Sequence, residues 1–94
     1  MPLLGLVMGS SSDEPVVQGA IDTLDQLNVD YEVRVMSAHR NPERVREYAL
    51  TARERGIEVF ISAAGGSAAL GGVLAAWTTI PVIGIPLASS DLNG

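Results

Sequence analysis

Residues 3–15 read LLGLVMGSSSDEP, and this join between an apolar run and a helix start decides the fold class. Residues 3–7 are apolar throughout, which is typical of a strand covered on both faces. The segment SSSDEP then offers serine and aspartate caps, an acidic first turn and a proline that the first turn tolerates. Apolar residues follow at helical spacing: Val17, Ala20, Ile21, Leu24 and Leu27. The segment therefore predicts a buried strand followed by an amphipathic helix.

The next segment is typical of a strand at an edge of the sheet. Residues 31–35, YEVRV, alternate apolar side chains with Glu32 and Arg34. A strand with one wet face, in a chain whose other strands are apolar, is expected at an edge. A second helix should follow, with Asn41 as its N-cap and Gly56 as its stop. Its predicted buried stripe consists of Val45, Tyr48, Ala49 and Ala52.

Two further apolar segments complete the pattern. Residues 59–64 (VFISAA) and 81–87 (PVIGIPL) are predicted to be buried strands, and residues 67–77 a closely packed helix between them. Repetition of strand, helix and strand implies a parallel sheet with right-handed crossovers and helices on both faces. We therefore predict one domain over residues 1–94, a flavodoxin-like or Rossmann-like three-layer αβα sandwich.

Composition excludes several classes of function. The chain has 94 residues and a net charge of −5, which gives no general attraction to nucleic acid or to an anionic membrane. All six basic residues are arginines and there is no cysteine, so a lysine Schiff base, a thiolate nucleophile and disulfides are excluded. A single histidine and no clustered carboxylate motif argue against a dedicated metal site. No apolar run approaches the roughly 20 residues of a membrane span, and the start lacks a signal peptide's basic region, so we expect a cytoplasmic protein.

The four predicted strand ends carry the polar residues suited to chemistry. They read MGSSSD, MSAHRNP, AAGGS and PLASS, whereas the opposite ends look like plain connectors. Ligands of open α/β sheets bind outside the carboxyl ends of the strands, so a site is predicted at this edge.

Each feature also has an ordinary structural interpretation. Ser10 and Asp13 could serve simply as helix caps, or they could also help to hold a phosphate at the helix N-terminus. Gly65 could make a tight turn or admit a ligand close to the backbone. Arg40 could be a solvated charge or a phosphate clamp. A lone histidine such as His39 often only packs or forms a hydrogen bond.

Three segments resemble the PurE family and change this balance. They are VMGSSSD (residues 7–13), YEVRVMSAHRNPERV (31–45) and ISAAGGSAALGGVLAAWTTIPVIGIPLASSDLNG (61–94). The second contains the S-A-H-R block, which is highly specific in this setting. The resemblance runs from about residue 4 to residue 94 and identifies the chain as similar to N5-carboxyaminoimidazole ribonucleotide mutases of purine biosynthesis.

The resemblance implies a reaction and a set of site residues. The family moves a carboxylate from N5 of the substrate to C4 of its imidazole ring, with no metal and no organic cofactor. His39 matches the family's catalytic proton shuttle. The positions that match those holding the ribose and phosphate are Ser10, Asp13, Ser37 and Arg40. The positions that match the loop enclosing the base and CO2 are Gly65, Ser67, Ala68 and Leu70.

Two departures from the family pattern leave other functions open. Ala69 stands where the family often has a second histidine, and Gly71 where it has a proline. The chain also ends at SSDLNG, where family members continue with a further strand and C-terminal helices. Direct carboxylation of aminoimidazole ribonucleotide by CO2 therefore stays an alternative, as does a catalytically weak nucleotide-phosphate-binding or assembly module.

Assembly is the last expectation. The family forms octamers, and residues 81–87 are apolar on both faces near the end of the chain. An uncovered apolar strand is an aggregation hazard, so we predict a homo-oligomer in which the face of residues 74–77, including Trp77, contacts a neighbouring subunit.

Overall fold

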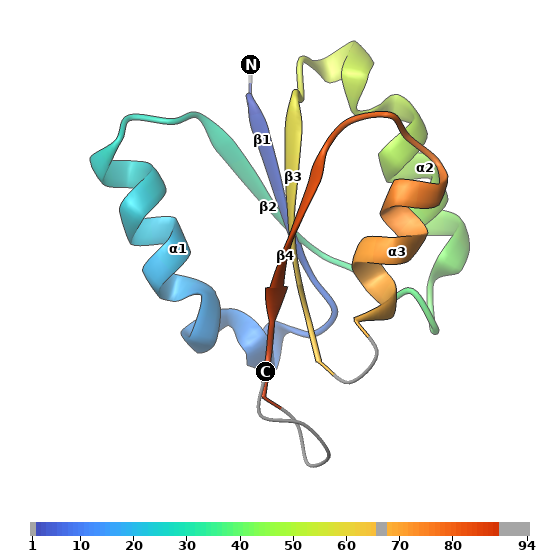
Figure 1. The fold of residues 1–94 in the computed structure, drawn as a ribbon, viewed down its shortest axis with the longest axis horizontal. Coiled ribbons are helices and arrows are strands. Elements are labelled where there is room, and N and C mark those ends of the chain that lie inside the picture. The colour runs from blue at the N-terminus through green and yellow to red at the C-terminus, as the bar shows by residue number, and fades with distance from the viewer. Residues whose placement is uncertain (1, 66–67, 89–94) are drawn as a thin grey trace.

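A computed structural model describes residues 2–65 and 68–88 of the chain (Figure 1). The elements are, in order, β1 (Leu4–Met8), the 3-10 turn η1 (Ser11–Asp13), α1 (Glu14–Gln26), β2 (Tyr31–Val35), α2 (Pro42–Thr51), the 3-10 turn η2 (Arg53–Arg55), β3 (Val59–Ala64), α3 (Ala69–Ala76) and β4 (Val82–Pro86). The described strands form one parallel sheet in the order β2-β1-β3-β4. This order is that of a flavodoxin-like sheet, so the predicted fold class is confirmed.

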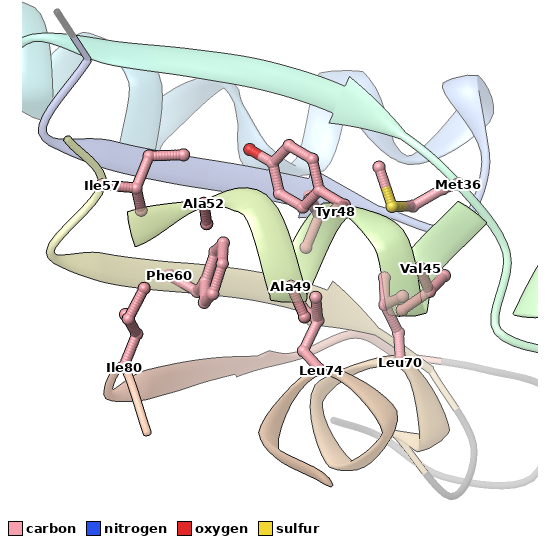
Figure 2. Close-up of a cluster of buried hydrophobic side chains, with 11 residues drawn as sticks. Met36, Val45, Tyr48, Ala49, Ala52, Ile57, Phe60, Leu70, Leu74 and Ile80 are labelled. Atoms are coloured by element: carbon pink, nitrogen blue, oxygen red, sulfur yellow. The ribbon is translucent and has the colours of Figure 1, made fainter. Parts of the chain in front are cut away.

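Helices cover both faces of this sheet, as predicted. α1 lies on one face, and α2 and α3 lie together on the other (Figure 1). On the face of α2 and α3, the core gathers around Phe60 of β3, which contacts residues such as Ala49 and Leu74 from the two helices (Figure 2). On the face of α1, Val17 and Leu24 pack on the sheet. These two clusters hold the three layers together by removing apolar surface from water.

The predicted edge position of residues 31–35 is confirmed, and the predicted wet face holds for the exposed Arg34 but is wrong for Glu32. Among the described strands, β2 pairs only with β1. The side chain of Glu32 is only 12% exposed, because α2 and η2 lie over it. Its Oε2 accepts a hydrogen bond from the Tyr48 hydroxyl at 2.5 Å and from Arg55 Nη2 at 3.1 Å. A buried carboxylate needs such partners, since an isolated buried charge is costly.

Helix starts and stops follow the predicted capping residues. Ser10 is the N-cap of η1 and its Oγ accepts from the N–H of Ser12. Asn41 is the N-cap of α2, although its side chain forms no capping hydrogen bond. Gly56 has a φ of 89°, the left-handed conformation that ends a helix and favours glycine. Leu27 departs from the prediction: α1 ends at Gln26, and Leu27 is 67% exposed.

The prediction that residues 81–87 form a buried strand is wrong for part of that segment. Ile83 is 54% exposed, although it shares a face of the sheet with the buried Leu87. α1 is the one helix on that face within residues 2–65 and 68–88, and β4 is the strand farthest from β2. An apolar strand face therefore stays open at this edge. No helix among the described residues is long and apolar enough to cross a membrane.

Candidate functional site

The carboxyl ends of the parallel strands meet at one edge of the sheet, where the loops after β1, β2 and β3 lie together. The Met36 N–H donates to the Met8 carbonyl at 2.9 Å, so the pairing of β1 and β2 continues to the start of the second loop. Arg40 Nη2 then reaches back to the carbonyl of Gly9 at 3.4 Å. This contact places Arg40, the residue predicted to bind a phosphate, beside the first loop.

The second loop is a tight turn organised by Ser37. Its Oγ accepts from the backbone N–H groups of His39, at 3.3 Å, and Arg40, at 3.1 Å. Its carbonyl accepts from the N–H of Asn41 at 2.8 Å, which leads into α2. The hydroxyl proton of Ser37 is not used by these contacts, so the same side chain can fix the turn and donate to a ligand.

A small cavity of about 150 Å³ lies where the loops meet. Ser37, Ala38 and His39 line one side of it, and Gly9 another. The end of β3 and the start of α3 close it through Ala64, Gly65, Ala69 and Leu70. Among the described residues, His39 is the one side chain in this lining that can act as a general acid or base. The described lining is therefore made of small or uncharged residues around one imidazole.

Of the other predicted site residues, Ser10 and Arg40 lie beside Gly9, which lines this cavity. Ser10 adjoins Gly9, and its hydroxyl also lies 2.9 Å from that of Ser12, so the capping interpretation holds for it. Asp13 makes no side-chain capping bond to α1, so its carboxylate is not used by the helix. Arg40 is exposed, whereas Leu70 is buried in the core and also lines the cavity. Ser67 lies outside the described residues.

The start of α3 holds Ala68 in an unusual conformation. Ala68 is the N-cap of α3 with φ 55° and ψ 39°, and its N–H donates to the Gly65 carbonyl at 3.0 Å. A left-handed conformation costs a residue with a Cβ roughly 1–2 kcal/mol relative to glycine. Backbone strain of this kind gathers at functional sites, so its position beside the cavity supports the predicted site.

The structure also gives a physical reason for Gly71. A Cβ at this position would lie 3.1 Å from Ser62 Oγ, and Ser62 is buried in β3. A larger residue there would require Ser62 to move. Gly71, where the resemblance led us to expect a proline, therefore leaves the space that the Ser62 side chain occupies.

Sequence reasoning missed the small residues that give the cavity its space, namely Gly9, Ala38, Ala64 and Ala69. The sequence feature that could have indicated them is the run of small residues after each strand. This feature predicted which edge of the sheet carries the site, but not which side chains line the cavity. A larger cavity of about 490 Å³ lies at the opposite edge, at the starts of β3 and β4. Its cation Arg53 already donates to Thr79 Oγ1 at 2.7 Å, and its lining contains no histidine.

Comparison with known proteins finds one matching family and several similar proteins. The profile of the AIR carboxylase family matches residues 3–94. The chain is 61% identical over 94 residues to a protein of Pyrococcus abyssi named N5-carboxyaminoimidazole ribonucleotide mutase, covering 100% of this chain and 54% of that protein. It is 58% identical over 93 residues to a Bacillus subtilis protein of the same name, covering 99% and 57%.

A solved structure is similar as well. The crystal structure of Treponema denticola PurE matches with a TM-score of 0.83 and 28% sequence identity, covering 99% of this chain and 60% of that one. The chain thus spans between half and two thirds of the length of these proteins.

Proposed function

We propose that this chain, which belongs to the AIR carboxylase family, acts as an N5-carboxyaminoimidazole ribonucleotide mutase. The reaction would move the carboxylate from N5 to C4 of the imidazole in purine biosynthesis. The relatives that carry this name are 61% and 58% identical to the chain. Their names support the proposal, and the geometry at the carboxyl edge of the sheet suggests how the residues would share the work.

The observation that carries the proposal is the position of His39. It lines a cavity otherwise built from small or uncharged residues, on the turn that also presents Ser37 and Arg40. Carboxylation at C4 requires loss of the ring proton from that carbon, and the amino nitrogen must recover a proton when its carboxylate leaves. A histidine is suited to both transfers, because a neutral imidazole has one nitrogen that can accept a proton and one that carries a proton. We therefore assign the proton transfers to His39.

The remaining residues would bind the substrate. The cavity of about 150 Å³ is smaller than the roughly 300–1,000 Å³ of typical ligand pockets. It would enclose only the reacting part of the substrate, the imidazole and CO2, beside Gly65 and Leu70. Ser67 and Ala68 belong to the same segment of sequence and are proposed to contribute to this enclosure. The ribose and phosphate would then lie over the rim, where Arg40 offers a forked guanidinium and Ser10, Asp13 and Ser37 offer polar side chains.

The test combines turnover with binding. Turnover of N5-carboxyaminoimidazole ribonucleotide is followed by ultraviolet absorbance, and affinity for the product nucleotide by calorimetry. His39→Asn should lower the rate about 10²–10⁴-fold while the affinity changes by less than about tenfold, because proton transfer is lost and phosphate contacts remain. A wild-type chain that binds the nucleotide without turnover would support the alternative of a binding module. A variant that keeps most of its rate would remove His39 from the mechanism.

Ala69 is the reason that we propose a second reaction as an alternative. It lines the cavity where the family often has a second histidine, so His39 is the one general acid or base among the described lining residues. Direct carboxylation of aminoimidazole ribonucleotide by CO2 needs only the removal of the C4 proton. Turnover with this substrate and bicarbonate, but not with the N5-carboxy compound, would favour the direct carboxylase.

Assembly and location also belong to the proposal. We propose a cytoplasmic homo-oligomer, an octamer by resemblance, that covers exposed apolar side chains such as Ile83 and Trp77, which are 54% and 44% exposed. The earlier expectation about residues 74–77 is corrected in one respect. Leu74 is fully buried in the core and cannot contact a neighbouring subunit, whereas the exposed Trp77 can. Light scattering coupled to size exclusion that gave a stable monomer at micromolar concentration would contradict this assembly.

A further inference from the structure

Three of the chain's six basic residues surround one cavity away from the site described above. The cavity has a volume of about 270 Å³ and lies between the edge strand β2 and the helix α2. Arg34 comes from β2, Arg44 from α2 and Arg55 from η2. No lining residue is shared with the cavity of His39. This cluster therefore needs an explanation of its own.

The carboxylates nearby do not neutralise the three guanidinium groups. Glu32 forms ion pairs with Arg55, at 3.1 Å, and with Arg34, at 3.5 Å, and it also accepts from a tyrosine hydroxyl. Arg44 has no ion pair with any described residue. Glu47 is the other acidic residue at the cavity. Two carboxylates thus face three arginines, which leaves one net positive charge on a chain whose total is −5.

Arg55 retains unused hydrogen-bonding capacity. Its guanidinium lies over the ring of Tyr48, 4.8 Å from the ring centre, and donates to Glu32 through Nη2. Its Nε is buried and has no hydrogen-bond partner within the described part of the chain. A buried donor without an acceptor is costly, and guanidinium groups bind planar or tetrahedral anions through paired N–H groups. The Nε itself is closed to solvent, so a ligand in the cavity would meet the exposed part of this guanidinium, whose side chain is 38% exposed.

We propose that this cavity binds a phosphate monoester of small size. The arginines supply the charge and the forked donors that a phosphate dianion requires. The floor beside them is formed by Tyr48 and the buried Met36, which suits a short organic group attached to the phosphate. The volume, just below the range of typical ligand pockets, matches a small ligand that the cavity encloses as a whole. This proposal does not depend on the reaction proposed for His39.

The test reads each arginine separately. Nuclear magnetic resonance of the arginine Nε–Hε groups is recorded while inorganic phosphate, or phenyl phosphate, is added at constant ionic strength. The signals of Arg34, Arg44 and Arg55 should shift along a saturable curve. Phenyl phosphate should bind several-fold more tightly than inorganic phosphate, because its ring covers the apolar floor. Shifts confined to Arg40, or a linear response without saturation, would overturn the proposal.

A pair of variants on one helix supplies the control. Arg44→Gln should weaken phosphate binding at this cavity about tenfold, since it removes a charged hydrogen bond from a residue that forms no ion pair within residues 2–65 and 68–88. Arg46→Gln removes the same charge two positions away, where the guanidinium stacks 4.8 Å above Trp77. It should leave affinity within about twofold. Equal losses in both variants would indicate general electrostatic attraction and overturn the site. Arginine shifts that follow protein concentration without phosphate would instead show a second chain in the cavity, and would also overturn it.

Discussion

Gly5→Ala offers a demanding test of how the sheet and α2 fit together. A Cβ at Gly5 would lie 2.5 Å from the Tyr48 hydroxyl and 3.1 and 3.2 Å from two ring carbons of Phe60. The first contact is closer than real Cβ atoms allow, so Tyr48 would have to move. The same hydroxyl donates to Glu32 at 2.5 Å, and moving it weakens that hydrogen bond.

The expected loss of stability follows from three contributions. Overpacking costs roughly 1–3 kcal/mol, and a hydrogen bond to a charged group contributes about 1.5–3 kcal/mol when fully formed. Replacing a strand glycine returns about 0.5–1 kcal/mol through the unfolded chain. With the hydrogen bond partly kept, we expect Gly5→Ala to lower the free energy of unfolding by about 2–3 kcal/mol, measured by urea unfolding with an unchanged slope.

A second substitution isolates the cause. Tyr48→Phe removes the hydroxyl that the new Cβ would meet, so Gly5→Ala should cost only about 1 kcal/mol in that background. The double-mutant cycle should therefore show a coupling of about 1–2 kcal/mol. Gly84→Ala is the matched control, because Gly84 also lies in a strand and a Cβ there would have no heavy atom within 4 Å. If Gly5→Ala costs no more than Gly84→Ala, or costs the same in both Tyr48 backgrounds, the packing argument is refuted.

Three further predictions concern binding, pH and backbone strain. Arg40→Ala should weaken binding of the product nucleotide by about 1.5–3 kcal/mol in calorimetry, with Arg46→Ala unchanged, because only Arg40 lies at the strand-end site; unchanged affinity in Arg40→Ala would place the phosphate elsewhere. Burial, and then the hydrogen bond to Glu32, raises the pKa of Tyr48 above its ordinary value of about 10. The folded state therefore favours the neutral phenol. The contribution of Tyr48 to stability should be complete below about pH 10 and decline above it, and urea unfolding should show a smaller decline in Tyr48→Phe. Ala68→Gly should raise the unfolding free energy by about 0.5–1 kcal/mol, because glycine adopts the left-handed conformation without a Cβ clash, whereas Ala68→Val should lower it.

The sequence by itself determined the elements and the edge that bears the site. Residues 59–64 form β3 with the bounds that the apolar run predicted, and β2 lies at the edge that its alternation indicated. These features depend on short-range rules, namely side-chain period, capping and the direction of parallel strands. The same rules brought the loop of Ser37, His39 and Arg40 next to Gly9, because carboxyl ends of parallel strands share one edge.

Only the tertiary structure decided which surfaces are covered and which polar groups meet. Periodicity tells which side of its own element a residue faces, but not whether another element lies there. Glu32 was therefore expected in water and lies beneath Tyr48 and Arg55, while the apolar Ile83 is exposed because no described helix reaches it. The gathering of Arg34, Arg44 and Arg55 around one cavity has the same origin. These residues come from three elements, and their proximity depends on how α2 and η2 pack against β2, a long-range relation that local patterns do not contain.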